Sequence, residues 1–191
     1  MRAPYADYLL RMIDTLRTER LVLRPIMTAD APAFYRFYSD PEVMRYIGKG
    51  EVVESEKQVR ESLARHRRTH YQEHNFGLWA VTGKSDGVVM GHCGVLFREI
   101  DSVREYEIAY LLGREYQGQG YATEAACATR DRGFSKRNFS RMISLIYPDN
   151  VVSLRVAERV GMRYQKDVIV MDDVRVRMYC LKNPAPEGQG E

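Results

Sequence analysis

A stretch of six residues, Gln-Gly-Gln-Gly-Tyr-Ala at positions 117–122, most constrains how this chain can fold. An apolar, strand-like run over residues 106–112 precedes it, and a helical pattern over residues 121–136 follows it. Two glycines spaced by one residue, Gly118 and Gly120, permit a tight turn and a close approach of the backbone to a ligand. The first amides of the helix and the positive end of its dipole then point to the same place. The stretch therefore predicts an anion-binding loop between a strand and a helix.

Two familiar phosphate-binding motifs do not match this loop. A dinucleotide fingerprint needs a third glycine where Thr123 stands, and an acidic residue about twenty positions further on, where the chain has Ser140. A Walker loop needs Gly-Lys-Ser or Gly-Lys-Thr, which is absent here. The glycine pair alone is equally compatible with a structural turn, so the neighbouring segments have to decide its role.

The rest of the chain alternates irregularly between strand and helix patterns. Two-residue alternation and turn residues predict seven strands, over residues 20–25, 76–81, 87–95, 106–112, 141–147, 162–171 and 174–181. Helical spacing and capping residues predict helices over residues 31–38, 41–46, 54–73, 121–136 and 151–160. This order indicates a mixed α/β layer arrangement rather than a regular βαβ alternation.

The two ends of the chain differ in composition from the segment between them. Residues 1–17 place tyrosines and aliphatic residues at helical spacing, which predicts an amphipathic leader helix. Residues 183–191 are rich in Pro, Gly and Glu, which is typical of a disordered tail. We therefore expect a single folded domain over residues 18–182.

Charge and cysteine content narrow the class of protein. A formal net charge of +3 is too small to indicate a nucleic-acid partner, and it suits an enzyme with an anionic ligand equally well. Three cysteines, an odd number in apolar contexts, predict reduced thiols rather than disulfides. No apolar run approaches the roughly 18 residues that a membrane span needs. Arg2 and Asp7 interrupt the region where a secretion signal would be apolar. We expect a cytoplasmic protein without a membrane partner.

Five short sequence motifs, including the loop, follow one another along the chain in an order that is informative as a set. The loop contains Gln117, Gly120 and Ala122, in the pattern Gln-x-x-Gly-x-Gly/Ala. The other segments are Thr-Glu-Arg-Leu-Val-Leu-Arg at 18–24, Glu-Ile-Ala-Tyr at 107–110, Asn-Val-Val-Ser at 150–153 and Val-Gly-Met at 160–162. Together they resemble the Rim-like branch, the ribosomal-protein N-terminal acetyltransferase type, of the GNAT superfamily of N-acetyltransferases.

The resemblance implies a fold and a donor substrate. The implied fold is a central mixed sheet of seven strands with flanking helices, in which the strand before the loop splays from residues 141–147. Acetyl-CoA is the implied co-substrate, with its pyrophosphate on the backbone of the loop and its pantetheine arm in the gap between the two splayed strands. The residues expected to contact it are Leu111, Leu112, Gly113, Gln117, Gly118, Gln119, Gly120, Tyr121, Ala122 and Asn150.

Glu107 is the candidate general base. Acetyl transfer needs a group that accepts a proton, because amines are mostly protonated near neutral pH. On an alternating strand Glu107 shares a face with Ala109 and Leu111. The alternative is a glutamate at the exposed start of a strand that forms an ion pair with Arg98 or Arg104.

The candidate general acid departs from the usual family pattern. Many GNAT enzymes have a tyrosine seven residues after the motif's asparagine, and here that position is Ala157. Ser153 is the expected replacement, although a serine in the first turn of a helix also bonds backbone amides. Asn150 is expected either to contact the pantetheine or to cap the same helix.

Metal ligation is not expected. His66, His70 and His74 recur every four residues, but no Cys or carboxylate cluster completes a site and the neighbouring arginines repel a cation. Near the acceptor site we expect the glycine-flanked joint 48–50, and Tyr46, Trp79 and His92 are each candidates for cleft or core.

The acceptor stays open at this stage. The resemblance points to a protein N-terminal amine, and a small amine such as a polyamine, an amino acid or an aminoglycoside is the alternative. An acidic cleft would favour a polyamine or an aminoglycoside, and an open groove would favour a peptide. A non-catalytic acyl-CoA-binding module is the rival from another class, and the oligomeric state, a homodimer included, is also open.

Overall fold

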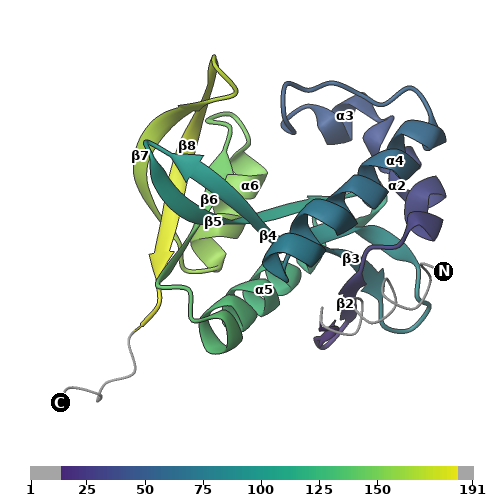
Figure 1. The fold of residues 1–191 in the computed structure, drawn as a ribbon, viewed down its shortest axis with the longest axis horizontal. Coiled ribbons are helices and arrows are strands. Elements are labelled where there is room, and N and C mark those ends of the chain that lie inside the picture. The colour runs from purple at the N-terminus through teal and green to yellow at the C-terminus, as the bar shows by residue number, and fades with distance from the viewer. Residues whose placement is uncertain (1–13, 185–191) are drawn as a thin grey trace.

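One mixed β-sheet runs through the part of the chain that the computed structural model describes, residues 14–184 (Figure 1). Within these residues the sheet has eight strands in the order β1-β2-β3-β4-β5-β6-β8-β7. The strands are β1 (Leu16–Arg17), β2 (Leu21–Pro25), β3 (Leu78–Gly83), β4 (Val89–Ile100), β5 (Val103–Leu112), β6 (Arg141–Ile146), β7 (Arg163–Val170) and β8 (Val174–Lys182). The mixed α/β fold class predicted from the sequence is confirmed, with one strand more than the seven expected.

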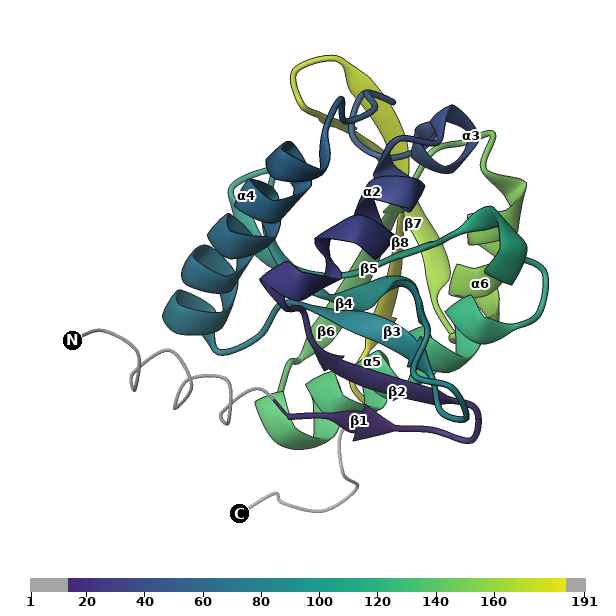
Figure 2. The same ribbon diagram turned by 90° about the vertical axis from the view of Figure 1, so that its right-hand side faces the viewer.

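Helices cover both faces of the sheet, as the two views in Figures 1 and 2 show. They are α2 (Ala31–Tyr38), α3 (Pro41–Met44), α4 (Glu56–His66), α5 (Tyr121–Arg137) and α6 (Val151–Arg159). Because side chains alternate along a strand, Ile108 and Leu112 of β5 pack in the core under α5. Leu111 between them packs with the residues of α2 and α4 on the other face. The apolar strand between the two helical layers is therefore buried on both sides.

The sheet is weakest where β5 meets β6. These two strands run parallel, and within the described chain one register pair, Glu107 with Ile143, joins them. By contrast, β4 and β5 pair antiparallel along ten residues. Just past the single pair, the Oγ of Ser144 donates to the carbonyl of Ile108 at 2.9 Å, so a side chain occupies the place of the next backbone bond. The splayed strand pair expected from the resemblance is therefore present between β5 and β6.

The hairpin of β4 and β5 is longer than the sequence pattern predicted. The pattern predicted that one strand ends at residue 95 and the next begins at 106, but β4 continues to Ile100 and β5 begins at Val103. Opposite charges face each other across this extension, Arg98 with Glu105 and Glu99 with Arg104, which stabilises an antiparallel pair. Asp101 and Ser102 both have positive φ, as a two-residue hairpin turn requires. The polar residues of this segment therefore form pairs across two strands and do not form a loop.

The eighth strand lies in the segment predicted as a leader helix. Residues 1–13 lie outside the described part, but Leu16 and Arg17 form β1 and pair with Leu23 and Val22 of β2. The carbonyl of Asp14 accepts a bond from the indole nitrogen of Trp79 at 2.8 Å. A helix over residues 14–17 is therefore wrong, because this segment is held extended against the sheet.

The C-terminal boundary also falls slightly later than predicted. Asn183 donates its backbone N–H to Ser140 at 2.9 Å, which extends the folded chain one residue past the expected end at 182. Residues 185–191, most of the tail predicted to be disordered, lie outside the described part.

The long helix predicted over residues 54–73 is interrupted. A capping box of Ser55 and Gln58 starts α4. After His66 the chain continues as a π-helical turn, Arg67–Gln72. The Nε2 of His66 accepts the backbone N–H of Leu78 at 2.9 Å, which ties the end of α4 to the start of β3. No helix within residues 14–184 is long and apolar enough to cross a membrane.

Candidate active site

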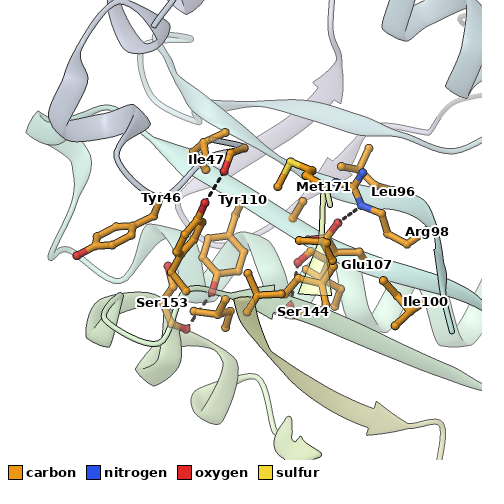
Figure 3. A pocket seen from close by; sticks show the side chains of 18 of the residues that line it. Tyr46, Ile47, Leu96, Arg98, Ile100, Glu107, Tyr110, Ser144, Ser153 and Met171 are labelled. Atoms are coloured by element: carbon orange, nitrogen blue, oxygen red, sulfur yellow. Dashed lines mark hydrogen bonds and ion pairs between the residues drawn. The ribbon is translucent and has the colours of Figure 1, made fainter. Parts of the chain in front are cut away.

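A cavity of 570 Å³ opens where β5 and β6 separate. Its walls come from β4, β5 and β6, from the start of α6, from the loop after α3 and from the β7–β8 hairpin. Figure 3 shows the side chains that point into it. Glu107, Asn150 and Ser153, predicted from three separate segments, all line this one cavity.

Glu107 combines features of the two alternatives that the sequence left open, a carboxylate in the site and a partner of Arg98. Its side chain lines the cavity and the residue is 7% exposed, so it is not at an exposed strand start. Its Oε2 also accepts a bond from the Nε of Arg98 at 2.6 Å, one of the two arginines named as alternative partners. The candidate base therefore has a cation on one of its oxygens.

Ser153 and Asn150 form the cap of α6. The Oδ1 of Asn150 accepts the backbone N–H of Ser153 at 3.1 Å, as the capping alternative predicted. Ala157, at the position where the resemblance would place a tyrosine, is 1% exposed and packs in the core. In Figure 3 Ser153 and Glu107 lie on opposite sides of the cavity. A direct proton exchange between these two side chains is therefore not favoured by the geometry.

Tyr110 is a cavity residue that sequence reasoning did not single out. It rises from β5, and its hydroxyl donates to the carbonyl of Ser153 at 3.0 Å (Figure 3). Burial, as the main cause, raises the pKa of Tyr110 well above its usual value, so the hydroxyl stays protonated. The available signal was its place on the strand two residues after Ile108, but alternation alone gave no reason to prefer it.

The predicted anion loop lies between β5 and α5. Gly118 and Gly120 have φ of +75° and +82°, the left-handed region that favours glycine, and Tyr121 begins α5. Two side-chain bonds hold the loop. Arg20 Nη1 donates to the carbonyl of Gln119 at 2.9 Å, and Gln119 Nε2 donates to the carbonyl of Glu115, just before the loop, at 2.8 Å. A Cβ built on Gly118 meets nothing within 4 Å, so the loop borders open space.

Arg20 is a second residue that the sequence reasoning missed at this loop. Its guanidinium lies 4.5 Å from the ring centre of Tyr121 and forms an ion pair with Glu124 at 2.7 Å. It stands in the first resembling segment, residues 18–24, but nothing in that segment shows that β2 begins beside α5. A half-exposed cation therefore lies next to the predicted pyrophosphate loop.

The backbone groups of β5 divide between its two edges. Gly113 donates its N–H to Met90 on the β4 side at 2.9 Å, and Gln117 Nε2 donates to Leu112 O at 2.9 Å. Since adjacent residues of a strand present their groups to opposite edges, Leu112 and Tyr110 face β6, and Leu111 and Gly113 face β4. Of the three residues expected to pair with a pantetheine arm, Leu112 faces the gap. The backbone groups of Leu111 and Gly113 point away from it, because the sheet already uses that edge.

A bridge borders the cavity. The loop after α3 joins the C-terminal part of the chain through Tyr147, whose hydroxyl donates to Gly48 O at 2.5 Å. Lys49 in the same loop pairs with Asp173 of the β7–β8 turn at 2.9 Å. The joint expected near the acceptor site is thus in contact with the hairpin on the far side, which argues against a long open groove.

Two of the three cleft-or-core candidates line the cavity. Tyr46 does so with its ring 5.7 Å from that of Tyr147. His92 does so while it is 7% exposed, and its Nδ1 lies 2.9 Å from the hydroxyl of Tyr38. Burial lowers the pKa of His92 to about 4, so it is neutral near pH 7. Trp79 belongs to the core instead.

The histidine series, which begins at the end of α4 and continues through the π-helical turn, has structural partners. His66 stacks on His70 at 4.3 Å and accepts a backbone bond from Leu78. Burial first, and then the neighbouring His70 and His92, lower the pKa of His66 to about 3. Among residues 14–184 no group of three His, Cys, Asp or Glu side chains is arranged to hold a metal ion.

Comparison with known proteins adds a family and several relatives. The model of the acetyltransferase (GNAT) domain family matches residues 20–163. YkkB of Bacillus subtilis (strain 168) is 36% identical over 154 residues, 80% of this chain and 87% of its own length. A solved acetyltransferase from Agrobacterium tumefaciens is 30% identical, with a TM-score of 0.74 over 88% of this chain and 94% of that one. RimL, a ribosomal L7/L12 alpha-N-protein acetyltransferase solved with coenzyme A, shares the fold at a TM-score of 0.76 and 17% identity, over 91% of this chain and 100% of its own.

Proposed function

The chain belongs to the GNAT acetyltransferase family, and from that premise we propose that it transfers the acetyl group of acetyl-CoA to a primary amine held beside Glu107. The family makes it an acetyl-CoA-dependent acetyltransferase. The observation that carries the rest of the proposal is one cavity that contains both the separated edge of β5 and a buried carboxylate.

The residues around the loop fit the donor. The amides at the start of α5, with the dipole of a helix of 17 residues, suit a pyrophosphate. The guanidinium of Arg20 adds a cation beside them. The Oγ1 of Thr123, in the first turn of α5, is buried and has no hydrogen-bond partner among the described residues. A buried hydroxyl without a partner costs free energy, which a phosphate oxygen would recover.

The pantetheine arm is assigned to the gap between β5 and β6. There Tyr110 and Leu112 turn their backbone groups toward the open edge, and an amide-containing arm can pair with them as another strand would. Leu111 and Gly113 are left out of this assignment because their backbone groups face β4.

The proposed reaction is a direct transfer. The amine nitrogen attacks the thioester carbonyl carbon, the C–S bond breaks, and the thiolate leaves and takes up a proton. Glu107 accepts the amine proton, directly or through a water molecule. Tyr110 donates its hydroxyl proton to the Ser153 carbonyl and so fixes the start of α6. The hydroxyl of Ser153, at the same side of the cavity, or a water molecule supplies the proton to the leaving sulfur.

For the acceptor, the first candidate is the α-amine at the N-terminus of a protein. RimL, which shares the fold, acts on the ribosomal protein L7/L12, and this supports the candidate by analogy. A small amine is the second candidate, and the bridge of Lys49 and Asp173 favours it because that bridge limits the length of chain that can lie across the cavity.

The test is a turnover assay with purified protein and acetyl-CoA. Released thiol is measured with a panel of small amines and of peptides with free N-termini, and the acetylated product is identified by mass spectrometry. We expect turnover of at least one amine and its loss in Glu107→Gln. Tight binding of acetyl-CoA without turnover of any amine would favour the non-catalytic module and overturn the proposal.

A further inference from the structure

The ion pair between Arg98 and Glu107 is a feature that the proposed reaction does not use. A general base needs a free oxygen lone pair facing the amine, yet a guanidinium nitrogen lies 2.6 Å from Oε2 of Glu107. The two partners differ in environment, because the side chain of Arg98 is 46% exposed and that of Glu107 is 9% exposed. The cation is therefore the partner that can move into solvent or toward a ligand.

The pairing is not forced by the sheet register. Arg98 stands opposite Glu105, and Leu96 stands opposite Glu107. Glu105 is buried and paired with Arg141, whose Nε lies 2.9 Å from its Oε2. Arg98 consequently leans along the hairpin toward Glu107 and into the cavity (Figure 3).

The geometry of the guanidinium suits a second anion. Arginine has five N–H donors in a planar fork, and the bond to Glu107 is made through Nε. Its two Nη groups form the edge that binds carboxylates in bidentate fashion. Glu107 is the ion-pair partner of Arg98 within residues 14–184.

Two of the other carboxylates near the cavity have ion-pair partners, and a third, Glu99 of the cavity wall, stands opposite Arg104 in the hairpin register. Asp101 pairs with Lys166 at 2.6 Å, and Asp173 pairs with Lys49 at 2.9 Å. Much of the remaining wall beside Arg98 is apolar, including Ile100, Val170 and Val176. An amine with several positive charges would meet few unpaired carboxylates here, whereas one with an anionic group would meet the half-exposed fork of Arg98.

We propose that Arg98 binds a carboxylate of the acceptor, so that the substrate class is a primary amine with a carboxylate a few bonds from its nitrogen. This inference rests on the proposed function, since it places the amine at Glu107. The carboxylate accepts hydrogen bonds from the two Nη groups of Arg98 and draws the guanidinium away from Glu107. Oε2 is then free to accept the amine proton. A free amino acid supplies such a carboxylate directly, and a peptide supplies it only through an acidic N-terminal residue.

The test compares matched acceptors that differ in the carboxylate alone. For wild type, kcat/KM is measured with free amino acids and with their amides, and with peptides that begin with Asp and with Asn. We expect the carboxylate member of a pair to be favoured at least about tenfold, as a charge-assisted bidentate bond implies. The pair that shows the preference identifies whether a free amino acid or an acidic N-terminus is the source.

Variants then assign the preference to Arg98. In Arg98→Gln the ratio of kcat/KM between the two members of a pair is expected to fall to about 1. Arg98→Lys, which keeps the charge without the fork, is expected to give an intermediate ratio, and it replaces the first variant if loss of the ion pair unfolds the protein. The control is Arg104→Gln on the same hairpin, whose guanidinium lies over the ring of Phe97 and which is expected to keep the wild-type ratio.

The outcomes separate this inference from the function beneath it. No turnover of any amine overturns the proposed function. Turnover with no carboxylate preference in wild type, or with a preference that both Arg98 variants retain, overturns the role of Arg98 and leaves the acetyl transfer standing.

Discussion

The two ends of the substrate path are built in different ways. At the donor end, the proposed contacts are mainly backbone amides of the loop over residues 117–122 and of β5, with positive φ at Gly118 and Gly120. At the acceptor end, the cavity is formed by side chains from the β4–β5 hairpin, β6, the loop after α3 and the β7–β8 hairpin. A backbone site depends on local conformation, which a short motif encodes. A side-chain site depends on how distant segments meet, and a short motif does not encode that.

The largest expected effect tests the acceptor end. Replacing Glu107 by Gln removes the proton acceptor and keeps the size of the side chain. We expect kcat/KM to fall by about 10²–10⁴-fold, the range for loss of general-base catalysis. Rates are measured from pH 6 to about 9, with acetyl-CoA binding followed separately by calorimetry. A variant with the wild-type rate and pH profile would show that Glu107 is not the base.

The next effect tests the donor end. Gly120→Ala places a side chain at φ +82° with its Cβ 3.4 Å from Arg20 Nη2. We expect about 1–2 kcal/mol of destabilisation and a KM for acetyl-CoA raised by about tenfold or more. Gly87→Ala is the matched control, because it has φ +71° and open space around its Cβ. It should show a similar loss of stability with the wild-type KM. An equal effect of the two variants on KM would contradict a donor role for the loop.

A pH effect on stability is expected from His66, at the end of α4. The pKa of His66 is lowered to about 3, whereas an unfolded histidine titrates near 6.5. Between these values the unfolded chain binds more protons, so stability falls as the pH is lowered from about 6.5 toward 3. His66→Gln should reduce that slope in thermal unfolding measured against pH. A slope equal to that of wild type would mean that other groups cause the acid sensitivity.

The smallest expected effect concerns the ion pair of Lys49 and Asp173 beside the cavity. Lys49 and Asp173 form an exposed pair, and such pairs contribute little to stability. Lys49→Gln and Asp173→Asn should therefore leave the melting temperature nearly unchanged. Each should change the KM for a bulky acceptor by about threefold or less, and the double variant should add no further change because the two act as one contact. Additive changes would show that the two residues contact the acceptor separately.

The sequence predicted the elements that depend on local pattern. Alternating apolar residues placed β5 and β6, and the glycine pair placed the loop before α5, because local conformation decides both. The same reasoning found Glu107, since a carboxylate within an apolar strand is conspicuous. The splay of β5 from β6 came from the family resemblance rather than from the pattern.

What the sequence did not predict depends on contacts between distant segments. The strand at Leu16 and Arg17 exists because β2 offers a free edge, and an amphipathic pattern over a few residues fits a helix equally well. Arg98 was named as an alternative partner of Glu107, but the extension of β4 that carries it into the cavity lies beyond the strand predicted over residues 87–95. Tyr147 and Lys49 join segments about a hundred residues apart, which no local signal reveals.

The single register pair between β5 and β6 has a mechanical consequence. The strands β1–β5 and β6–β8 form two plates that share one point of backbone contact at Glu107 and Ile143 within the described chain. With one backbone pair between them, the width of the gap is held mainly by side-chain bonds, such as those of Ser144 with Ile108 and of Tyr110 with Ser153. A ligand that pairs with β5 in this gap would therefore add contacts between the two parts of the sheet. We expect the ligand to stiffen the sheet at the place where the sheet has the fewest backbone bonds of its own.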